Sequence, residues 1–295
     1  MVVSAPLFTE KATVEDYIIE KLKEEGWKHV PGEQLEREDY SEPLLIGDFV
    51  KALKRINENL DLSEGDVNRI LAELRSKPAS FEGSKHILRF LKQGIAIKLE
   101  KTRELKYISL LDQENLENNN FVVSNQVRFE SSLGVIRPDI VLYVNGIPLV
   151  VIECKNPTEP GASWEAAYRQ VKGYENTVPE LFKYVQFSIA AEVTARYFPN
   201  VLGQREVSCS LWREEGFEDE LDATLEMLRR STLVDLIVNF TFAREEHGLS
   251  TKVLPRFMQY QAVNLIYSRV MKNLEGKEEK NSGLVWHWQG SGKTL

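Results

Sequence analysis

The sequence predicts a mixed α/β protein, with a central mixed β-sheet flanked by helices and a helical insertion near the N-terminus. Residues 13–27 have helical periodicity, and about residues 41–105 contain further helical segments. From there to residue 154 the pattern changes to short apolar, β-branched runs that are typical of strands. Helical and strand patterns alternate again after that point, so the sheet is expected in the middle of the chain.

The first helix is predicted in "TVEDYIIEKLKEEGW", where Thr13 takes the position of an N-cap and Gly26 that of a C-terminal stop. Its apolar face comprises Val14, Tyr17, Ile18 and Leu22. The insertion is predicted to contain helices in "LLIGDFVKALKRINENL", "LSEGDVNRILAELRS" and "SKHILRFLKQGIAI". Asn, Asp, Ser, Gly and Pro residues separate these segments, as expected of connections between helices.

Strands are predicted in "LKYISLL", "NFVVSNQVRFE", "PDIVLYV" and "IPLVVIEC". A helix follows in "SWEAAYRQVKGYENTVPELF", and "YVQFSIAAEV" reads as a buried strand. Two later helices are expected in "EDELDATLEMLRR" and "STLVDLIVNFTFA", and an amphipathic one in "VLPRFMQYQAVNLIYSRVMKNL". The charged stretch "EGKEEKNSG" then separates this helix from a short apolar strand, "LVWHW".

The composition is that of a soluble globular protein, with 42% hydrophobic and 28% charged residues among 295. No apolar run is long enough for a membrane span, and the N-terminus does not resemble a secretory signal. Cys154 and Cys209, with four scattered histidines, argue for a reducing compartment and against a zinc site. We therefore expect a cytoplasmic protein with no membrane partner. The net charge of −8 argues against nonspecific coating of nucleic acid but leaves room for a local basic groove.

The stretch "RPDIVLYVNGIPLVVIECKNP" predicts a buried hairpin that ends in charged residues. Glu153 and Lys155 are two apart on a strand, so their side chains leave the same face. With a plain two-residue turn at Asn145-Gly146, Asp139 would lie opposite Ile152 and on the other face. An odd-length loop or a β-bulge would instead place Asp139 and Glu153 on one face, and this is what we predict.

Such a constellation suits metal-dependent chemistry on phosphodiesters. Asp139 and Glu153, with the backbone carbonyl of Cys154, could hold a Mg²⁺ ion that also keeps several waters. The metal would polarise the phosphodiester and activate a water, and Lys155 would orient that water or stabilise negative charge in the transition state. The alternative is a surface ion pair at a strand end, which is common for an isolated E-x-K.

Pro138-Asp139 followed by Glu153-Cys154-Lys155 matches the PD-(D/E)xK nuclease motif. The sequence around this motif resembles the N-terminal domain of the R (restriction) subunit of type I restriction enzymes. This resemblance implies a restriction-endonuclease-like core of the RecB-like nuclease type. It also implies roles for three residues outside the hairpin. Gln170 and Tyr174 match a Gln-x-x-x-Tyr motif that lies beside the metal and positions DNA, and Glu15 matches a glutamate on the first core helix that faces the metal.

The end of the chain resembles the start of a helicase-like motor. "GSGKT" follows a short apolar strand as a Walker A loop does, although the full pattern has glycine where His287 stands. The loop residues expected to hold the phosphates and Mg²⁺ of ATP are Gly290, Ser291, Gly292, Lys293 and Thr294. Upstream, "RFMQYQA" resembles the adenine-reading Q motif of superfamily 2 helicases, with Gln259 in the key place and Arg256 before it.

We therefore expect an endonuclease domain over residues 1–250, with the insertion at about 41–105. Residues 251–295 would be the truncated start of an ATP-dependent translocase domain, with the Q motif and Walker A loop only. The remaining motor motifs are absent from the sequence, so the ATPase is expected to be incomplete here.

The expected function is that of a type I site-specific deoxyribonuclease, which cleaves double-stranded DNA with Mg²⁺ and couples cleavage to ATP-driven translocation in the full-length protein. In the family that it resembles, the R subunit joins methylation (M) and specificity (S) subunits. The alternatives are a nuclease of another helicase-fused restriction system, of type III-like or solitary kind, and a non-catalytic DNA-binding or assembly module with a vestigial nuclease fold. An ATPase or ATP-sensing protein is a further alternative.

Overall fold

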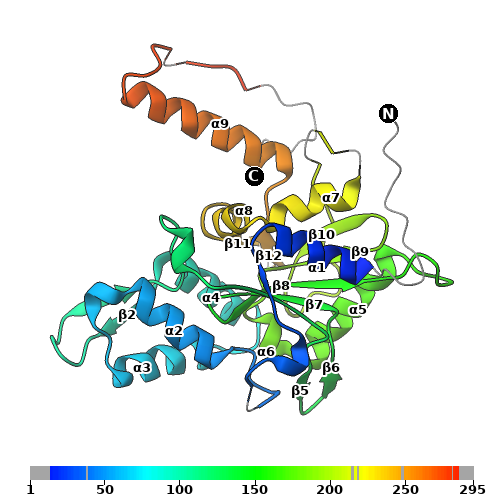
Figure 1. Cartoon of the computed structure of the whole chain (residues 1–295), viewed down its shortest axis with the longest axis horizontal. Helices are drawn as coiled ribbons and strands as arrows, with labels where there is room; N and C mark the ends of the chain where they lie inside the picture. The colour runs from blue at the N-terminus through cyan, green and yellow to red at the C-terminus, as the bar shows by residue number, and fades with distance from the viewer. Residues whose placement is uncertain are drawn as a thin grey trace.

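A computed structural model describes residues 14–37, 39–213, 216–217, 219–246, 249–280 and 282–285. A mixed β-sheet lies at the centre with helices on both sides, and the last helix extends away from this body (Figure 1). The helices are α1 (Val14–Glu24), α2 (Ile46–Ile56), α3 (Glu64–Arg75), α4 (Phe81–Gln93), α5 (Trp164–Thr177), α6 (Pro179–Phe182), α7 (Glu220–Leu225), α8 (Arg230–Asp235) and α9 (Phe257–Leu274). The predicted fold class, mixed α/β with a helical insertion, is confirmed.

The six-stranded sheet has the order β1-β4-β7-β8-β9-β10. Its β1–β4 and β8–β9 pairs are parallel and the other neighbouring pairs are antiparallel. These strands are β1 (Lys28–His29), β4 (Phe121–Asn125), β7 (Ile140–Val144), β8 (Ile147–Cys154), β9 (Phe187–Ala191) and β10 (Ala195–Pro199). Three separate hairpins pair β2 (Ile95–Lys98) with β3 (Leu105–Ile108), β5 (Phe129–Ser131) with β6 (Gly134–Ile136), and β11 (Phe242–Glu246) with β12 (Leu249–Val253).

Period-two alternation along β7 and β8 fills both faces of the sheet. Val141 and Val151 pack in the core that includes Ala167 and Val171 of α5. Ile140 and Ile152 pack on the opposite face, in the larger core shared with α1, the insertion helices, α7 and α8. Because successive side chains alternate, Asp139, Glu153 and Lys155 belong to the α5 face.

The hairpin of β7 and β8 contains both a tight turn and a bulge. Asn145 and Gly146 form a two-residue turn with φ angles of 54° and 73°. The register then shifts between Leu142 and Tyr143, so that Leu149 is the extra residue of β8. The predicted bulge is thus confirmed, and its odd-length-loop alternative is wrong.

Several element boundaries differ from the sequence prediction. The segment "GIAI" is not the end of a helix, because Gly94 terminates α4 with φ 77° and the chain enters β2. The predicted strand "NFVVSNQVRFE" is broken at Gln126, which has φ 53°. The predicted helix after the hairpin ends at Thr177, and Pro179 opens the short α6. Strand β10 and the β11–β12 hairpin have no counterpart in the prediction, and Thr13 lies outside the described residues.

An aromatic cluster joins the first turn of α9 to the body of the molecule. Trp212, which is fully buried, packs edge-to-face on Phe257 with ring centroids 5.3 Å apart, and it also contacts Tyr260 at 5.5 Å. The hydroxyl of Tyr197 on β10 donates a hydrogen bond to the carbonyl of Pro255 at 2.9 Å. We call Tyr197, Trp212, Phe240, Phe257 and Tyr260 the junction cluster.

The predicted division of the chain at residue 250 falls inside the β11–β12 hairpin. Lys252 of β12 is buried and donates hydrogen bonds to Ser84 Oγ at 3.0 Å and to the carbonyls of Val185 and Gln186 at 3.2 Å. On the other side of residue 250, Glu245 of β11 accepts a hydrogen bond from Lys85 Nζ of α4 at 2.8 Å. The hairpin is therefore anchored to the body on both sides of residue 250, and the division into two domains stays a prediction. Within the described ranges, no helix is long and apolar enough to cross a membrane.

Candidate active site

Asp139, Glu153 and Lys155 meet at one edge of the sheet, where β7 begins and β8 ends. The register of the bulged hairpin pairs Ile140 with Ile152, which places Asp139 beside Glu153 on the neighbouring strand. Lys155 Nζ lies 3.3 Å from Glu153 Oε1. The three side chains predicted to share a site are thus brought together by the bulge.

The Asp139 carboxylate is held from two sides. Its Oδ2 accepts a hydrogen bond from the backbone N–H of Cys154 at 2.8 Å. Its Oδ1 accepts one from the side-chain amide of Gln126 at 2.9 Å. Hydrogen bonds to both oxygens fix the plane of the carboxyl group.

Glu153 is 1% exposed, and its Oε2 is buried without a hydrogen-bond partner among the described residues. Burial, with the nearby negative charge of Asp139, raises the pKa of Glu153 to about 8, although Lys155 acts in the opposite direction. A buried carboxylate oxygen without a hydrogen-bond partner is costly, so Glu153 Oε2 is an acceptor that a cation at this edge would satisfy.

Lys155 is connected to α5 through the Gln-x-x-x-Tyr pair. Lys155 Nζ donates to Gln170 Oε1 at 2.5 Å, and Gln170 Nε2 donates to the Tyr174 hydroxyl at 2.5 Å. That hydroxyl donates to the carbonyl of Arg137 at 3.4 Å, two residues before Asp139. Burial, with the negative charge of Glu153, raises the pKa of Tyr174, so the hydroxyl keeps its proton. The helical spacing of four places Gln170 and Tyr174 on one face, as predicted.

Glu15 reaches the same edge from α1, on the other face of the sheet. Its Oε1 accepts from Asn125 Nδ2 and its Oε2 from Gln126 Nε2, both at 2.8 Å. Burial raises the pKa of Glu15, and the two amide hydrogen bonds act against this rise. Glu15 is therefore linked to Asp139 through Gln126 rather than by direct contact.

Asn125, Gln126 and His29 were not recognised from the sequence. His29 Nε2 and Asn125 Oδ1 lie 2.9 Å apart, so the chain of hydrogen bonds extends from His29 to Asp139. The available signal was the polar pair Asn125-Gln126 directly after the apolar run "FVVS". A strand that ends on two amides facing a carboxylate cannot be recognised without knowing which helix lies opposite.

The donor set at this edge suits a hard divalent cation. Asp139 and the unpartnered Glu153 Oε2 offer carboxylate oxygens, and the backbone carbonyl of Cys154 is the further donor that the sequence predicted. Burial raises the pKa of the Cys154 thiol well above its usual range, which makes that sulfur unsuited to metal binding. The described residues contain no group of three or more His, Cys, Asp and Glu side chains placed to hold a metal. Mg²⁺ is commonly held by one or two carboxylates and keeps several waters, so the two carboxylates at this edge fit that ion.

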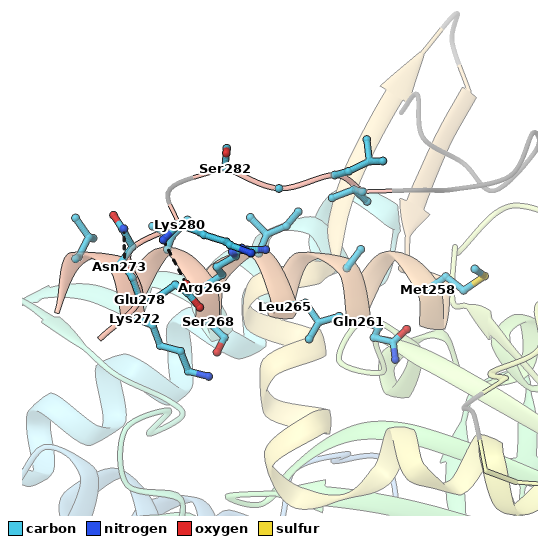
Figure 2. A pocket seen from close by; sticks show the side chains of 17 residues that line it. Met258, Gln261, Leu265, Ser268, Arg269, Lys272, Asn273, Glu278, Lys280 and Ser282 are labelled. Carbon is cyan, nitrogen blue, oxygen red and sulfur yellow. Dashed lines mark hydrogen bonds between the residues drawn. The ribbon is translucent and has the colours of Figure 1, made fainter. Parts of the chain in front are cut away.

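The residues predicted to bind ATP are only partly described. Gln259 lies in the first turn of α9, and its Oε1 caps the helix by accepting from the backbone N–H of Arg256 at 2.9 Å. The loop residues Gly290, Ser291, Gly292, Lys293 and Thr294, and His287 before them, lie outside the described residues. A groove runs along α9 and the segment after it, lined by Gln261, Leu265, Ser268, Arg269 and Ser282 among others (Figure 2). Of the predicted site residues that the structure describes, none lines this groove.

A mixed sheet flanked by helices, with two carboxylates and a lysine at one edge, defines a restriction-endonuclease-like α/β domain. The chain belongs to the family described as type I restriction enzyme R protein N terminus, whose model matches residues 7–207. Residues 258–295 match a second family, described as SWI2/SNF2 ATPase.

Relatives of the chain are found in archaea and bacteria. It is 34% identical to the putative type I restriction enzyme MjaVIIIP endonuclease subunit of Methanocaldococcus jannaschii, over 96% of this chain and 28% of that protein. It is 33% identical to the putative MjaVIIP endonuclease subunit of the same organism, over 70% of this chain and 20% of that protein. It is 29% identical to the type I restriction enzyme HindI endonuclease subunit of Haemophilus influenzae, over 96% of this chain and 29% of that protein. The chain therefore spans less than a third of the length of these relatives.

Proposed function

We propose that this chain is the metal-dependent endonuclease domain of a type I restriction enzyme R subunit, and that it hydrolyses phosphodiester bonds of double-stranded DNA. The observation that carries the proposal is the convergence of Asp139, Glu153 and Lys155 at one sheet edge, produced by the bulge at Leu149. Membership of the R protein family and the names of the relatives as endonuclease subunits support the same assignment.

Each residue at this edge of the sheet would have its own role in the reaction. Asp139 and Glu153 would hold Mg²⁺, together with the backbone carbonyl of Cys154. When bound, the metal supplies Lewis-acid activation of the phosphodiester and a water of lowered pKa. The pKa of Glu153 is raised to about 8, so this carboxyl group would have to lose its proton to hold the cation. Lys155, held by Gln170 and Glu153, is placed to orient the attacking water or to stabilise the charge that develops on the phosphoryl oxygens.

Tyr174 and Gln170 position this lysine rather than react. Their hydrogen bonds run from the carbonyl of Arg137 to Lys155 Nζ. Helix α5 therefore links the segment before β7 to the segment after β8. Glu15 of α1 would add a further carboxylate near the cation. Its hydrogen bond with Gln126, which also contacts Asp139, would help to position the cation.

In the full-length protein, cleavage would be coupled to ATP-driven translocation on DNA. The match of residues 258–295 to an ATPase family supports this part of the proposal. Arg256 and Gln259 would bind the adenine, and the loop Gly290, Ser291, Gly292, Lys293 and Thr294 would bind the phosphates with Mg²⁺. The partners would be double-stranded DNA and the methylation (M) and specificity (S) subunits of a cytoplasmic restriction complex.

The test is plasmid cleavage by the assembled complex with ATP and Mg²⁺, comparing wild type with Asp139→Ala and Lys155→Ala. Both variants are expected to bind DNA as wild type does and to lose cleavage by about 10³-fold or more, because each removes a group of the reacting site. Lys101→Ala is the matched control, since Lys101 forms an exposed ion pair with Asp61 in the insertion. Unchanged cutting by both site variants would remove the catalytic assignment. A wild-type complex that binds DNA but never cuts it would favour the vestigial module instead.

A further inference from the structure

Gln126 lies where β4 ends, and its side chain joins two carboxylates. Its Nε2 donates to Glu15 Oε2 at 2.8 Å and to Asp139 Oδ1 at 2.9 Å. Its backbone N–H also donates to the carbonyl oxygen of Asp139 at 2.8 Å. A primary amide nitrogen carries two hydrogens, so both are used on acidic oxygens from two different elements.

The backbone at Gln126 adopts an unusual conformation that makes this bridge possible. Its φ of 53° is left-handed, which costs roughly 1 kcal/mol or more for a residue with a side chain. In a continuing strand, Asn125 and Gln126 would point to opposite faces of the sheet. Here both amides reach the same Glu15 carboxylate, Asn125 at Oε1 and Gln126 at Oε2. A strained residue whose side chain makes charge-assisted contacts in the centre of a polar site indicates a functional constraint.

The bridge fixes the Asp139 carboxylate and leaves acceptor sites on both of its oxygens. Each carboxylate oxygen has about two lone-pair sites. One site on Oδ2 is used by the N–H of Cys154, and one on Oδ1 is used by Gln126. The carboxylate plane is then fixed, and one lone-pair site on each oxygen remains for a cation.

We infer that Gln126 is a positioning residue for the cation held by Asp139 and Glu153, because it locks the Asp139 carboxylate and sets its relation to Glu15. This inference rests on the proposed nuclease function and adds to it a residue that neither touches the cation nor belongs to the PD-(D/E)xK motif. Partners that orient metal-ligating groups typically contribute 10–100-fold to metal affinity or activity.

The experiment compares Gln126→Asn and Gln126→Gly with wild type. Asparagine tolerates a left-handed backbone but is one methylene shorter, so it cannot span both carboxylates, and glycine removes both the side chain and the backbone strain. Mn²⁺ binding to this chain is measured by electron paramagnetic resonance of the free ion, and the Mg²⁺ dependence of cleavage is measured in the assembled complex.

Both variants are expected to weaken Mn²⁺ binding about tenfold and to raise the Mg²⁺ concentration at half-maximal cleavage by a similar factor. The cleavage rate at saturating Mg²⁺ should return to within a few-fold of wild type, since no group that contacts DNA is lost. If Gln126 had a merely structural role, the variants would have a lower unfolding temperature, and saturating Mg²⁺ would not restore their cleavage rate. Arg103→Asn is the control, because Arg103 is exposed and also left-handed, with φ 60°, and is expected to leave both readouts unchanged.

Wild-type Mn²⁺ affinity and wild-type Mg²⁺ dependence in both variants would overturn the inference and leave the proposed nuclease intact. If the wild-type chain binds no Mn²⁺ and the complex does not cut DNA, the proposed function itself fails and this inference fails with it. The two failures are therefore distinguished by the behaviour of the wild-type protein.

Discussion

Lys155 Nζ donates a hydrogen bond to Gln170 Oε1 at 2.5 Å, across the space between the end of β8 and the second turn of α5. The lysine is 21% exposed at its side chain and also contacts Glu153. Lysine has a long, flexible side chain, so two fixed partners remove most of its rotamer freedom before a substrate arrives. The geometry of the ammonium group thus depends on a helix that contributes no carboxylate to the site.

Replacing Gln170 tests this dependence. Gln170→Met keeps the length of the side chain and removes its oxygen, so Lys155 loses one of its two partners. We expect DNA cleavage to fall by about 10- to 100-fold, because small misplacements of a reacting group are costly. Mn²⁺ affinity should stay within about twofold, since both carboxylates are untouched. Gln93→Met at the exposed end of α4 is the matched control, and equal cleavage by the two variants would contradict the prediction.

The pKa of Glu153 predicts a pH dependence of stability in the metal-free protein. The folded state raises this pKa from 4.5 to about 8, so over that interval the folded protein binds more protons than the unfolded chain. The contribution of Glu153 to the free energy of unfolding is therefore fully present below pH 4.5. It is lost as the pH rises towards 8, by up to about 1.4 kcal/mol per pH unit. Urea unfolding with a chelator at pH 5, 7 and 9 measures this loss.

Glu153→Gln should abolish that part of the pH dependence, because the amide does not titrate. Wild type is expected to lose stability relative to the variant from pH 5 to pH 9. Glu33→Gln makes the same substitution at an exposed position and should give a curve parallel to wild type. Parallel curves for wild type and Glu153→Gln would show that Glu153 titrates normally.

The tight turn of the hairpin is predicted to tolerate no side chain at its second position. A Cβ on Gly146 would lie 2.4 Å from the carbonyl oxygen of Leu45 and 2.8 Å from the backbone nitrogen of Phe49, with φ at +73°. Gly203 has a similar φ of +89°, and a Cβ there would meet no other described part of the chain within 4 Å. A substitution at Gly203 therefore isolates backbone strain from the clash.

We expect Gly203→Ala to lower the free energy of unfolding by about 1 kcal/mol and Gly146→Ala by at least about 2 kcal/mol more. Chemical denaturation of the two variants measures the difference. Equal losses would mean that the start of α2 moves aside without cost and does not hold the turn.

The junction cluster is predicted to hold the first turn of α9. Trp212→Ala removes the buried ring that contacts Phe257 and Tyr260, and should cost about 3–5 kcal/mol. Hydrogen exchange of the amides in the first turn of α9 should accelerate more than that in β8. Tyr267→Ala, on the part of the same helix where the side chain is 63% exposed, should change stability by less than about 0.5 kcal/mol. Unchanged exchange in Trp212→Ala would show that α9 is held by other contacts.

Local pattern in the sequence was sufficient to predict the central hairpin. Alternating apolar residues predicted that β7 and β8 are buried, and the spacing of Glu153 and Lys155 placed both on one face. The requirement that Asp139 share that face predicted an irregularity in the pairing. These inferences hold because, within a regular stretch of strand, side chains alternate between the two faces of the sheet.

Boundaries were less predictable where a single residue ends an element. Gly94 ends a helix and Gln126 ends a strand, and both have a positive φ. The segment after each is compatible in sequence with a continuation of that helix or strand. Strand β10 and the β11–β12 hairpin are short and lack strong alternation, so their strand character depends on the neighbours with which they pair.

The class of fold, the family, and the two carboxylates and lysine that could meet were therefore predictable from the order of residues alone. The bulge at Leu149 that brings them together, and the bridge from Gln126 to Glu15 and Asp139, depend on how the folded chain packs. Glu15 and Gln126 are 111 positions apart, and their contact exists because α1 packs on one face of the sheet while Asp139 projects from its edge. Such contacts are set by how helices and sheet pack on a shared core, and no local propensity encodes them.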